Sequence, residues 1–137
     1  MTTELAKLQP VPTPESEAFW QACGEGRLLI QRCDECGHRQ FYPRALCTAC
    51  SSAEVALTEA AGTGRVKSFT IIRRAVTEAY ADDVPYVVAL IELAEGPTMM
   101  SNVVECEAED VFIGMPVSVR FEPRSGDISL PVFAPDS

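Results

Sequence analysis

Four cysteines within eighteen residues are the feature that most constrains how this chain folds. Cys33 and Cys36 form one Cys-x-x-Cys pair, and Cys47 and Cys50 form a second pair after an interval of ten residues. A two-residue gap lets both cysteines of one tight turn face inward, and four thiolates satisfy a tetrahedral zinc ion at about 2.3 Å each. The spacing predicts a closed, rubredoxin-like zinc ribbon with one structural ion per chain.

The alternatives for these cysteines are a disulfide, a redox Cys-x-x-Cys pair, free buried thiols, and iron in place of zinc, because a tetrahedral four-sulfur site also holds iron. In rubredoxins the pairs lie farther apart and glycine normally follows the second, whereas Ser51 follows Cys50 here, so zinc is favoured. Four protein ligands leave no open position on the metal, which argues against metal-centred catalysis. His38 is expected to be exposed and not a ligand.

Composition and charge narrow the class of protein. The chain has 137 residues, 47% of them hydrophobic, which is enough for a buried core. No stretch approaches the roughly 18 apolar residues of a membrane span, and the start lacks a signal-peptide pattern, so we expect a cytoplasmic protein without a membrane partner. A net charge of −9 argues against binding to a nucleic-acid backbone.

Cys23 and Cys106 lie outside the two cysteine pairs and are expected to be lone buried thiols.

The first part of the chain predicts an arm and a helix. Residues 1–13 are polar and proline-spaced, as expected of a flexible arm. Residues 14–26 are assigned to a helical unit, because Thr13 suits an N-cap and Pro14 suits the first helical position. The helix is expected to run from about Pro14 to Cys23.

Five side chains are candidates for contact with a partner or ligand. Phe19 and Trp20 on the helix either pack on the ribbon or dock on another protein, and the sequence leaves both open. Phe41, Tyr42 and Arg44 form an aromatic and basic rim between the cysteine pairs. Arg44 either pairs with a carboxylate, covers the metal sulfurs, or contacts an anionic ligand or a partner, for which a guanidinium is well suited.

The rest of the chain is mainly β. Residues 27–58 are assigned to the ribbon and residues 59–137 to a barrel, with strands expected at 65–73, 86–93, 98–106, 117–122 and 129–133. Five antiparallel strands with a short element after the third match an OB-fold, although a five-stranded barrel of another topology stays open. Residues 75–85 are either a mobile binding loop or an ordinary solvated one.

The sequence offers no pattern typical of a catalytic site. It contains neither a glycine-rich phosphate loop nor a Ser-His-Asp or Cys-His pattern, and its single histidine restricts general-base chemistry. We therefore expect a protein that is not itself an enzyme.

The order of motifs resembles the DUF35 family. The resemblance covers nearly the whole chain after residue 13, and its motifs include Gly26-Arg27-Leu28, Gln31-Arg32-Cys33, Pro43-Arg44, Glu95-Gly96-Pro97, Ile113-Gly114-Met115-Pro116-Val117 and Leu130-Pro131. It implies a zinc ribbon followed by an OB-fold. It also implies a non-catalytic partner, in a hetero-oligomer, of a thiolase, lipid-transfer-protein thiolase or aldolase acting on acyl-CoA thioesters.

Two other functions stay open beside the one that the resemblance implies. The first is a free-standing module that binds acyl-CoA, and the second is an OB-fold that binds nucleic acid, which the charge disfavours. Acyl-CoA carries phosphates that a chain of net charge −9 does not attract over long range. Local contacts from Arg44, Arg65, Arg73 and Arg74, or groups of the partner, would have to hold them.

Overall fold

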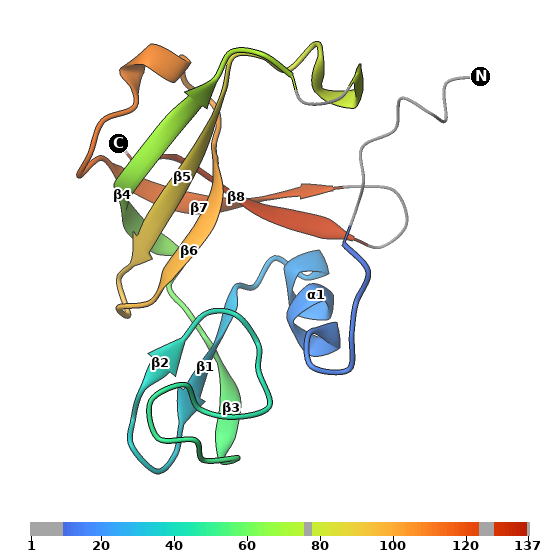
Figure 1. Cartoon of the computed structure of the whole chain (residues 1–137), viewed down its shortest axis with the longest axis vertical. Coiled ribbons are helices and arrows are strands. Elements are labelled where there is room, and N and C mark those ends of the chain that lie inside the picture. The colour runs from blue at the N-terminus through green and yellow to red at the C-terminus, as the bar shows by residue number, and fades with distance from the viewer. Residues whose placement is uncertain (1–9, 76–77, 124–127, 137) are drawn as a thin grey trace.

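The computed structural model describes residues 10–75, 78–123 and 128–136, and the predicted arm at 1–13 lies mostly outside them. The described residues form one α-helix, a three-stranded unit and a five-stranded barrel (Figure 1), so the mainly β fold is confirmed. In chain order the elements are α1 (Glu17–Gly24), β1 (Leu29–Cys33), β2 (Arg39–Gln40), β3 (Val55–Glu59), β4 (Thr63–Ile72), a 3-10 helix (Glu78–Tyr80), β5 (Tyr86–Leu93), β6 (Thr98–Val103), a second 3-10 helix (Ala108–Asp110), β7 (Pro116–Pro123) and β8 (Ser129–Pro135).

Helix α1 begins at Glu17, later than the predicted start at Pro14. The prediction was wrong because Thr13 and Ser16 form a turn of their own. The Ser16 hydroxyl accepts a hydrogen bond from the Thr13 amide at 2.9 Å, and the Thr13 carbonyl accepts the amides of Ser16 and Glu17. Pro14 therefore lies in this turn, and the helix starts after it.

The ribbon is a small antiparallel sheet with strand order β2-β1-β3. Strand β1 places Gln31 opposite Gln40 and Arg32 opposite Arg39 of β2. On its other side it pairs with β3, from Leu29 to Cys33. Strand β2 was not predicted, because two residues are too few to produce a periodic pattern and only pairing with β1 defines them.

The remaining strands close into a barrel in the order β4-β5-β6-β8-β7, with β4 also pairing with β7. This order is that of an OB-fold, as predicted. Strand β5 has the predicted bounds, whereas β6 ends at Val103 and not at residue 106. The parallel pairing of β6 with β8 consists of one register pair, Val103 with Phe133, so this seam of the barrel is the weakly paired one.

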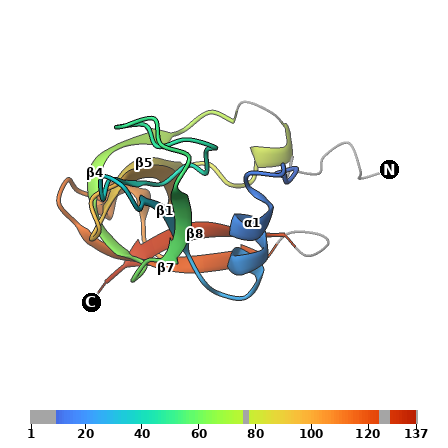
Figure 2. The ribbon, with the colours of Figure 1, turned by 90° about the horizontal axis from the view of Figure 1, so that it is seen from below.

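Ribbon, helix and barrel share one hydrophobic core. Leu28 and Ile30 from the ribbon belong to the same buried cluster as Ile91, Val117 and Phe133 from the barrel. Figures 1 and 2 show α1 lying beside β7 and β8, at the junction of the two β units. The two units therefore pack together as one body.

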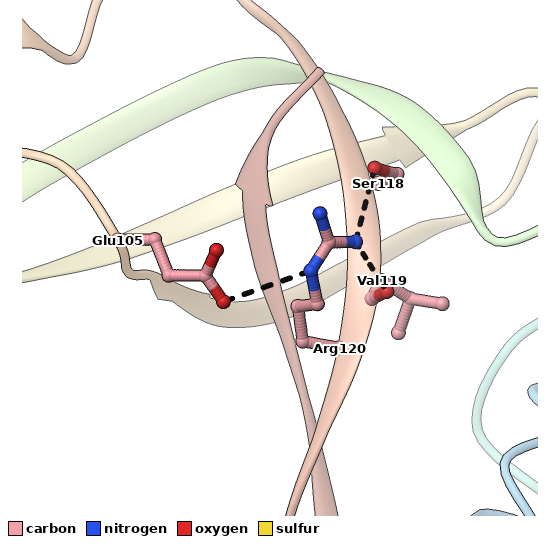
Figure 3. A network of polar contacts seen from close by, with 4 residues as sticks. All are labelled: Glu105, Ser118, Val119 and Arg120. Carbon is pink, nitrogen blue, oxygen red and sulfur yellow. Dashed lines mark hydrogen bonds and ion pairs between the residues drawn. The ribbon is translucent and has the colours of Figure 1, made fainter. Parts of the chain in front are cut away.

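An exposed ion pair fastens the segment after β6 to β7 (Figure 3). The Arg120 Nε lies 3.6 Å from a carboxylate oxygen of Glu105, and its Nη1 donates to the Ser118 hydroxyl and the Val119 carbonyl. Both charged side chains are exposed, so the pair contributes little to stability.

The structure also bears on the expected loop at 75–85 and on the two cysteines outside the cluster. The segment 75–85, expected to be a binding or solvated loop, contains the first 3-10 helix, and its residues 76–77 lie outside the described residues, so both interpretations stay open. Cys23 is buried as expected, but Cys106 is only half-buried. In the part of the chain that the structure describes, no helix is long and apolar enough to cross a membrane.

Candidate metal centre and ribbon–barrel groove

Two tight turns present the four cysteines. In the first, the Gly37 amide donates to the Cys33 carbonyl at 2.9 Å, and in the second the Ser51 amide donates to the Cys47 carbonyl at 2.9 Å. Gly37 and Ser51 both have left-handed backbones, with φ of 78° and 67°. The two turns are therefore repeats of one geometry, and Ser51 adopts in the second the conformation that favours glycine.

The sulfur atoms of Cys33, Cys36, Cys47 and Cys50 converge. All four lie within 4.8 Å of one another, and the Cys33–Cys50 and Cys36–Cys47 distances are both 3.6 Å. A tetrahedron of sulfurs at about 2.3 Å from a metal has edges of about 3.8 Å, whereas a disulfide requires about 2.05 Å. The four thiols therefore have the geometry of a metal-binding cluster, and all four cysteines are free of disulfides.

Backbone amides favour the thiolate form in this cluster. Amides of Cys36 and Glu35 lower the pKa of the Cys33 thiol against the opposing effect of burial. Burial also opposes ionisation of Cys47, but the amides of Cys50 and Ala49 lower its pKa to about 6. The pKa values of Cys36 and Cys50 are instead raised, that of Cys50 to about 12, because contacts with neighbouring cysteine thiols and burial outweigh the amides of His38 and Ser52. The thiolate, which is the form that binds a metal, is therefore favoured at Cys33 and Cys47.

A pair of buried glutamines holds the loop that joins the two cysteine turns. The Gln31 Oε1 accepts from the Gln40 side-chain amide at 2.8 Å and from the Arg44 backbone amide at 2.9 Å, and the Gln31 Nε2 donates to the Arg44 carbonyl at 2.9 Å. The Gln40 Oε1 in turn accepts from the amide and the hydroxyl of Thr48. Arg44 in the loop is thereby tied to β1, and Thr48 at its end is tied to β2.

Sequence reasoning missed these glutamines because only the β1–β2 register places them opposite each other. It did anticipate that His38 is exposed and lies outside the metal cluster. The His38 Nε2 lies 3.0 Å from the Thr48 hydroxyl. Since that hydroxyl gives its hydrogen to Gln40, His38 is the donor in this contact.

The candidate contact residues separate into buried and exposed members. Phe19 and Phe41 are only 4% and 7% exposed, and their rings meet edge to face at 5.4 Å. Trp20 packs on Phe19 at 4.9 Å and is half-buried, and Tyr42 packs on Phe41 at 4.9 Å and is 46% exposed. The four rings form a continuous row from α1 to the ribbon, whose inner pair belongs to the core.

Tyr42 also connects the ribbon to the barrel. Its phenolic oxygen accepts a hydrogen bond of 3.2 Å from the Met100 amide on β6. The phenolic hydrogen is then available for an acceptor outside this contact. The Arg44 side chain is exposed, while its backbone is held by Gln31.

A groove of about 460 Å³ lies between α1, the ribbon loop and the weakly paired seam of β6 and β8. Its walls are mainly apolar, and they comprise Ser16, Phe19, Trp20, Phe41, Tyr42, Pro43, Met99, Met100, Ser101, Asn102, Leu130, Pro131 and Val132. The Ser101 hydroxyl spans the seam to the Pro131 carbonyl at 2.8 Å. The volume and lining are typical of a site for an apolar group with few polar contacts.

The arginines considered for phosphate contacts are not gathered at this groove. Arg73 is paired with Glu109 at 3.1 Å, and Arg65 donates to the Gly114 carbonyl at 3.1 Å. Arg65 lines a different hollow, of about 450 Å³, together with Glu92 and Asp136. Two carboxylates beside one guanidinium make that hollow a poor site for an anion.

Two family models and several known proteins match the sequence of this chain. The model of the ChsH2 rubredoxin-like zinc ribbon domain matches residues 20–56, and that of the ChsH2 C-terminal OB-fold domain matches residues 57–122. A DUF35 domain-containing scaffold protein from Methanocaldococcus jannaschii is 35% identical over 104 residues, which are 74% of this chain and 73% of that protein. The chain belongs to the DUF35 family.

Two other similar proteins have names that include an enzyme, and this DUF35 chain spans less than half of the first. A probable enoyl-CoA hydratase alpha subunit from Thermomonospora curvata is 38% identical over 130 residues, which are 93% of this chain but only 40% of that relative. A chain of the solved Ltp2-ChsH2(DUF35) aldolase superposes with a TM-score of 0.83 at 35% identity, covering 93% of this chain and 98% of that one. The family and the order of its two domains, expected from the motifs, are confirmed.

The sulfur geometry predicts what removal of one ligand does. We expect the purified chain to hold about one metal ion, and Cys33→Ser or Cys47→Ser to lose the ion together with the fold of the ribbon, because metal binding and folding are coupled. Elemental analysis and circular dichroism measure the two effects. Cys106→Ser, outside the cluster, is the control and keeps both; a chain that melts normally without metal would contradict the prediction.

The glutamine pair leads to a second prediction. Gln31→Ala leaves the Gln40 side chain and the Arg44 backbone without their buried partner, so we expect it to lower the free energy of unfolding by about 2–3 kcal/mol. Denaturant unfolding of the metal-loaded protein measures this. Gln21→Ala, at an exposed position of α1, should change the stability by less than about 0.5 kcal/mol. Equal effects of the two substitutions would show that the buried network contributes nothing.

Proposed function

We propose that this chain is a non-catalytic accessory subunit of a thiolase-superfamily complex acting on acyl-CoA thioesters. In that complex it aids assembly, acyl-CoA binding, or both. The observation that carries the proposal is its similarity, over 93% of its length, to a chain of the Ltp2-ChsH2(DUF35) aldolase. The similarity to an enoyl-CoA hydratase alpha subunit also supports an acyl-CoA thioester as the substrate of the complex.

We further propose that the metal is zinc and that its role is structural. The all-thiolate donor set suits zinc, and four protein ligands leave no position for water or substrate. Any reaction of the complex then takes place on the partner enzyme. Iron at the same stoichiometry in elemental analysis would contradict the assignment of zinc.

The surface around the groove is our candidate for contact with the partner or its substrate. Tyr42 and Arg44 are exposed and Trp20 is half-buried, while Phe19 and Phe41 support them from inside. Because the glutamine pair and the shared core hold these side chains, the surface is ordered before any partner arrives. A preorganised surface loses little conformational entropy on binding.

A second candidate function is binding of acyl-CoA by the chain alone. The groove favours it, because an apolar site of about 460 Å³ suits an acyl or pantetheine chain. The Tyr42 hydroxyl would offer a hydrogen to a carbonyl at the groove, whereas Arg65 and Arg73 are engaged in contacts elsewhere. The net charge of −9 makes a partner that supplies the phosphate contacts the better expectation.

The first test is co-purification with a thiolase-superfamily enzyme encoded beside the gene for this chain. We expect the two proteins to elute together in size-exclusion chromatography, and the enzyme to be more soluble or more active with the chain than without it. A chain with Cys47→Ser serves as the control that lacks an ordered ribbon. Separate elution, with unchanged enzyme activity and solubility, would refute the proposed function.

The second candidate leads to a calorimetric prediction. Titration of the isolated chain with acyl-CoAs of different chain length should give weak binding whose affinity increases with the length of the acyl group, since the groove is apolar. Trp20→Ala should weaken it, and Gln21→Ala on the exposed side of the same helix should not. Absence of heat at about millimolar ligand would exclude useful binding by the chain alone.

A further inference from the structure

One border of the groove is an edge of β6 that no described strand covers. Strands β6 and β8 share one register pair, Val103 with Phe133, and the same register continued places Ser101 beside Pro131. In a parallel ladder the amide of that β8 residue would donate to the carbonyl of Met100, but proline has no amide hydrogen. Met100, Ser101 and Pro131 all line the groove, so the groove runs along this interrupted ladder.

The backbone of Met100 faces the groove. Met100 lies opposite Leu90 of β5, and its amide donates to the phenolic oxygen of Tyr42 at 3.2 Å, so the amide points away from β5. In an antiparallel pair the amide and the carbonyl of one residue point to the same side, so the Met100 carbonyl also points toward the groove. The phenolic oxygen of Tyr42 therefore stands where the carbonyl of an added strand would accept this hydrogen bond.

We propose that an extended peptide segment of a partner protein binds in the groove by adding to the Met100 edge of β6. This inference rests on the proposed function, in which the partner is the thiolase-superfamily enzyme. The bound segment accepts a hydrogen bond from the Met100 amide, donates one to the Met100 carbonyl, and displaces the phenol of Tyr42. In strand addition, main-chain hydrogen bonds provide affinity and pockets for alternate side chains provide specificity. The described lining of the groove contains no charged residue, so the side chains that enter it are apolar.

The hydrogen-bonding groups of this edge favour a peptide over the other occupants. A hydrocarbon chain satisfies neither the amide nor the carbonyl of Met100, and the described lining offers no charge to the phosphates of CoA. The pantetheine arm carries amides, but the extra methylene of its β-alanine unit takes them out of step with Thr98 and Met100, which are one strand period of about 6.8 Å apart. In a second copy of this chain the β6 edge is likewise bordered by α1 and the ribbon loop, so two such edges do not meet.

The first test follows the hydrogen exchange of the Met100 amide in the variant Tyr42→Phe. Without the phenolic oxygen, this amide has no acceptor in the free chain and exchanges its hydrogen quickly. We expect the thiolase-superfamily enzyme encoded beside the gene for this chain to slow the exchange about 10-fold or more, because a carbonyl of the added segment accepts the hydrogen bond. Equal exchange rates in the free and the enzyme-bound chain would overturn the inference.

The second test compares the affinities of full-length, metal-loaded variants for the same enzyme. Met100→Pro removes the amide hydrogen where it faces away from β5, and we expect it to bind about 10-fold or more weakly. Met100→Ala keeps the amide and shortens the side chain, so it should lose less affinity. Tyr42→Phe should bind about 2- to 5-fold more tightly, because no phenol has to be displaced. The melting temperature and metal content of each variant show whether it is folded.

Each other result has a distinct meaning. A wild-type chain that does not associate with the enzyme overturns the proposed function and this inference together. Equal losses of affinity for Met100→Pro and Met100→Ala overturn this inference alone. Weaker association of Tyr42→Phe, together with competition between acyl-CoA and the enzyme, would assign the groove to the acyl group instead. A wild-type dimer and a monomeric Met100→Pro variant in sedimentation equilibrium would assign the edge to self-association.

Discussion

The convergence of four cysteine sulfurs is the interaction on which the first half of the molecule depends. The ribbon has one strand of two residues and two strands of five, too little to form a stable sheet alone. A metal held by the four thiolates would supply the missing stability, as in other small metal-stapled domains. Backbone amides of the same turns lower the pKa of Cys33 and Cys47, so the geometry and the ionisation of these two thiols have one structural origin.

Polar and apolar contacts connect the cysteine turns to the barrel. Gln31 and Gln40 hold the loop between the cysteine turns, and the loop places Phe41 in the core and Tyr42 against the Met100 amide. Helix α1 completes the junction through Phe19, which packs on Phe41. The groove lies where β6 and β8 pair at a single position, and these aromatic rings form part of its lining. The groove is thus formed by the ribbon and the barrel together.

A closed metal site, an acidic chain and ordered apolar surfaces suit a subunit that acts through contact with another protein. The charge of −9 works against long-range attraction of phosphates, and the guanidinium of Arg73 is paired. Apolar groups therefore remain the main means of recognition at the groove. These considerations agree with the accessory role that we propose.

The sequence by itself determined the four cysteines that converge, the order of ribbon and barrel, and the bounds of β5, because cysteine spacing and a continuous apolar run are local properties of the chain. It misplaced the start of α1, since Thr13 and Ser16 form a local hydrogen-bonded turn in place of the expected N-cap. Only the tertiary structure decided that Phe19 and Phe41 are core residues while Tyr42 is exposed, that Gln31 faces Gln40, and that a groove lies at the β6–β8 seam. These features depend on register and on packing between segments far apart in the sequence, which no local pattern encodes.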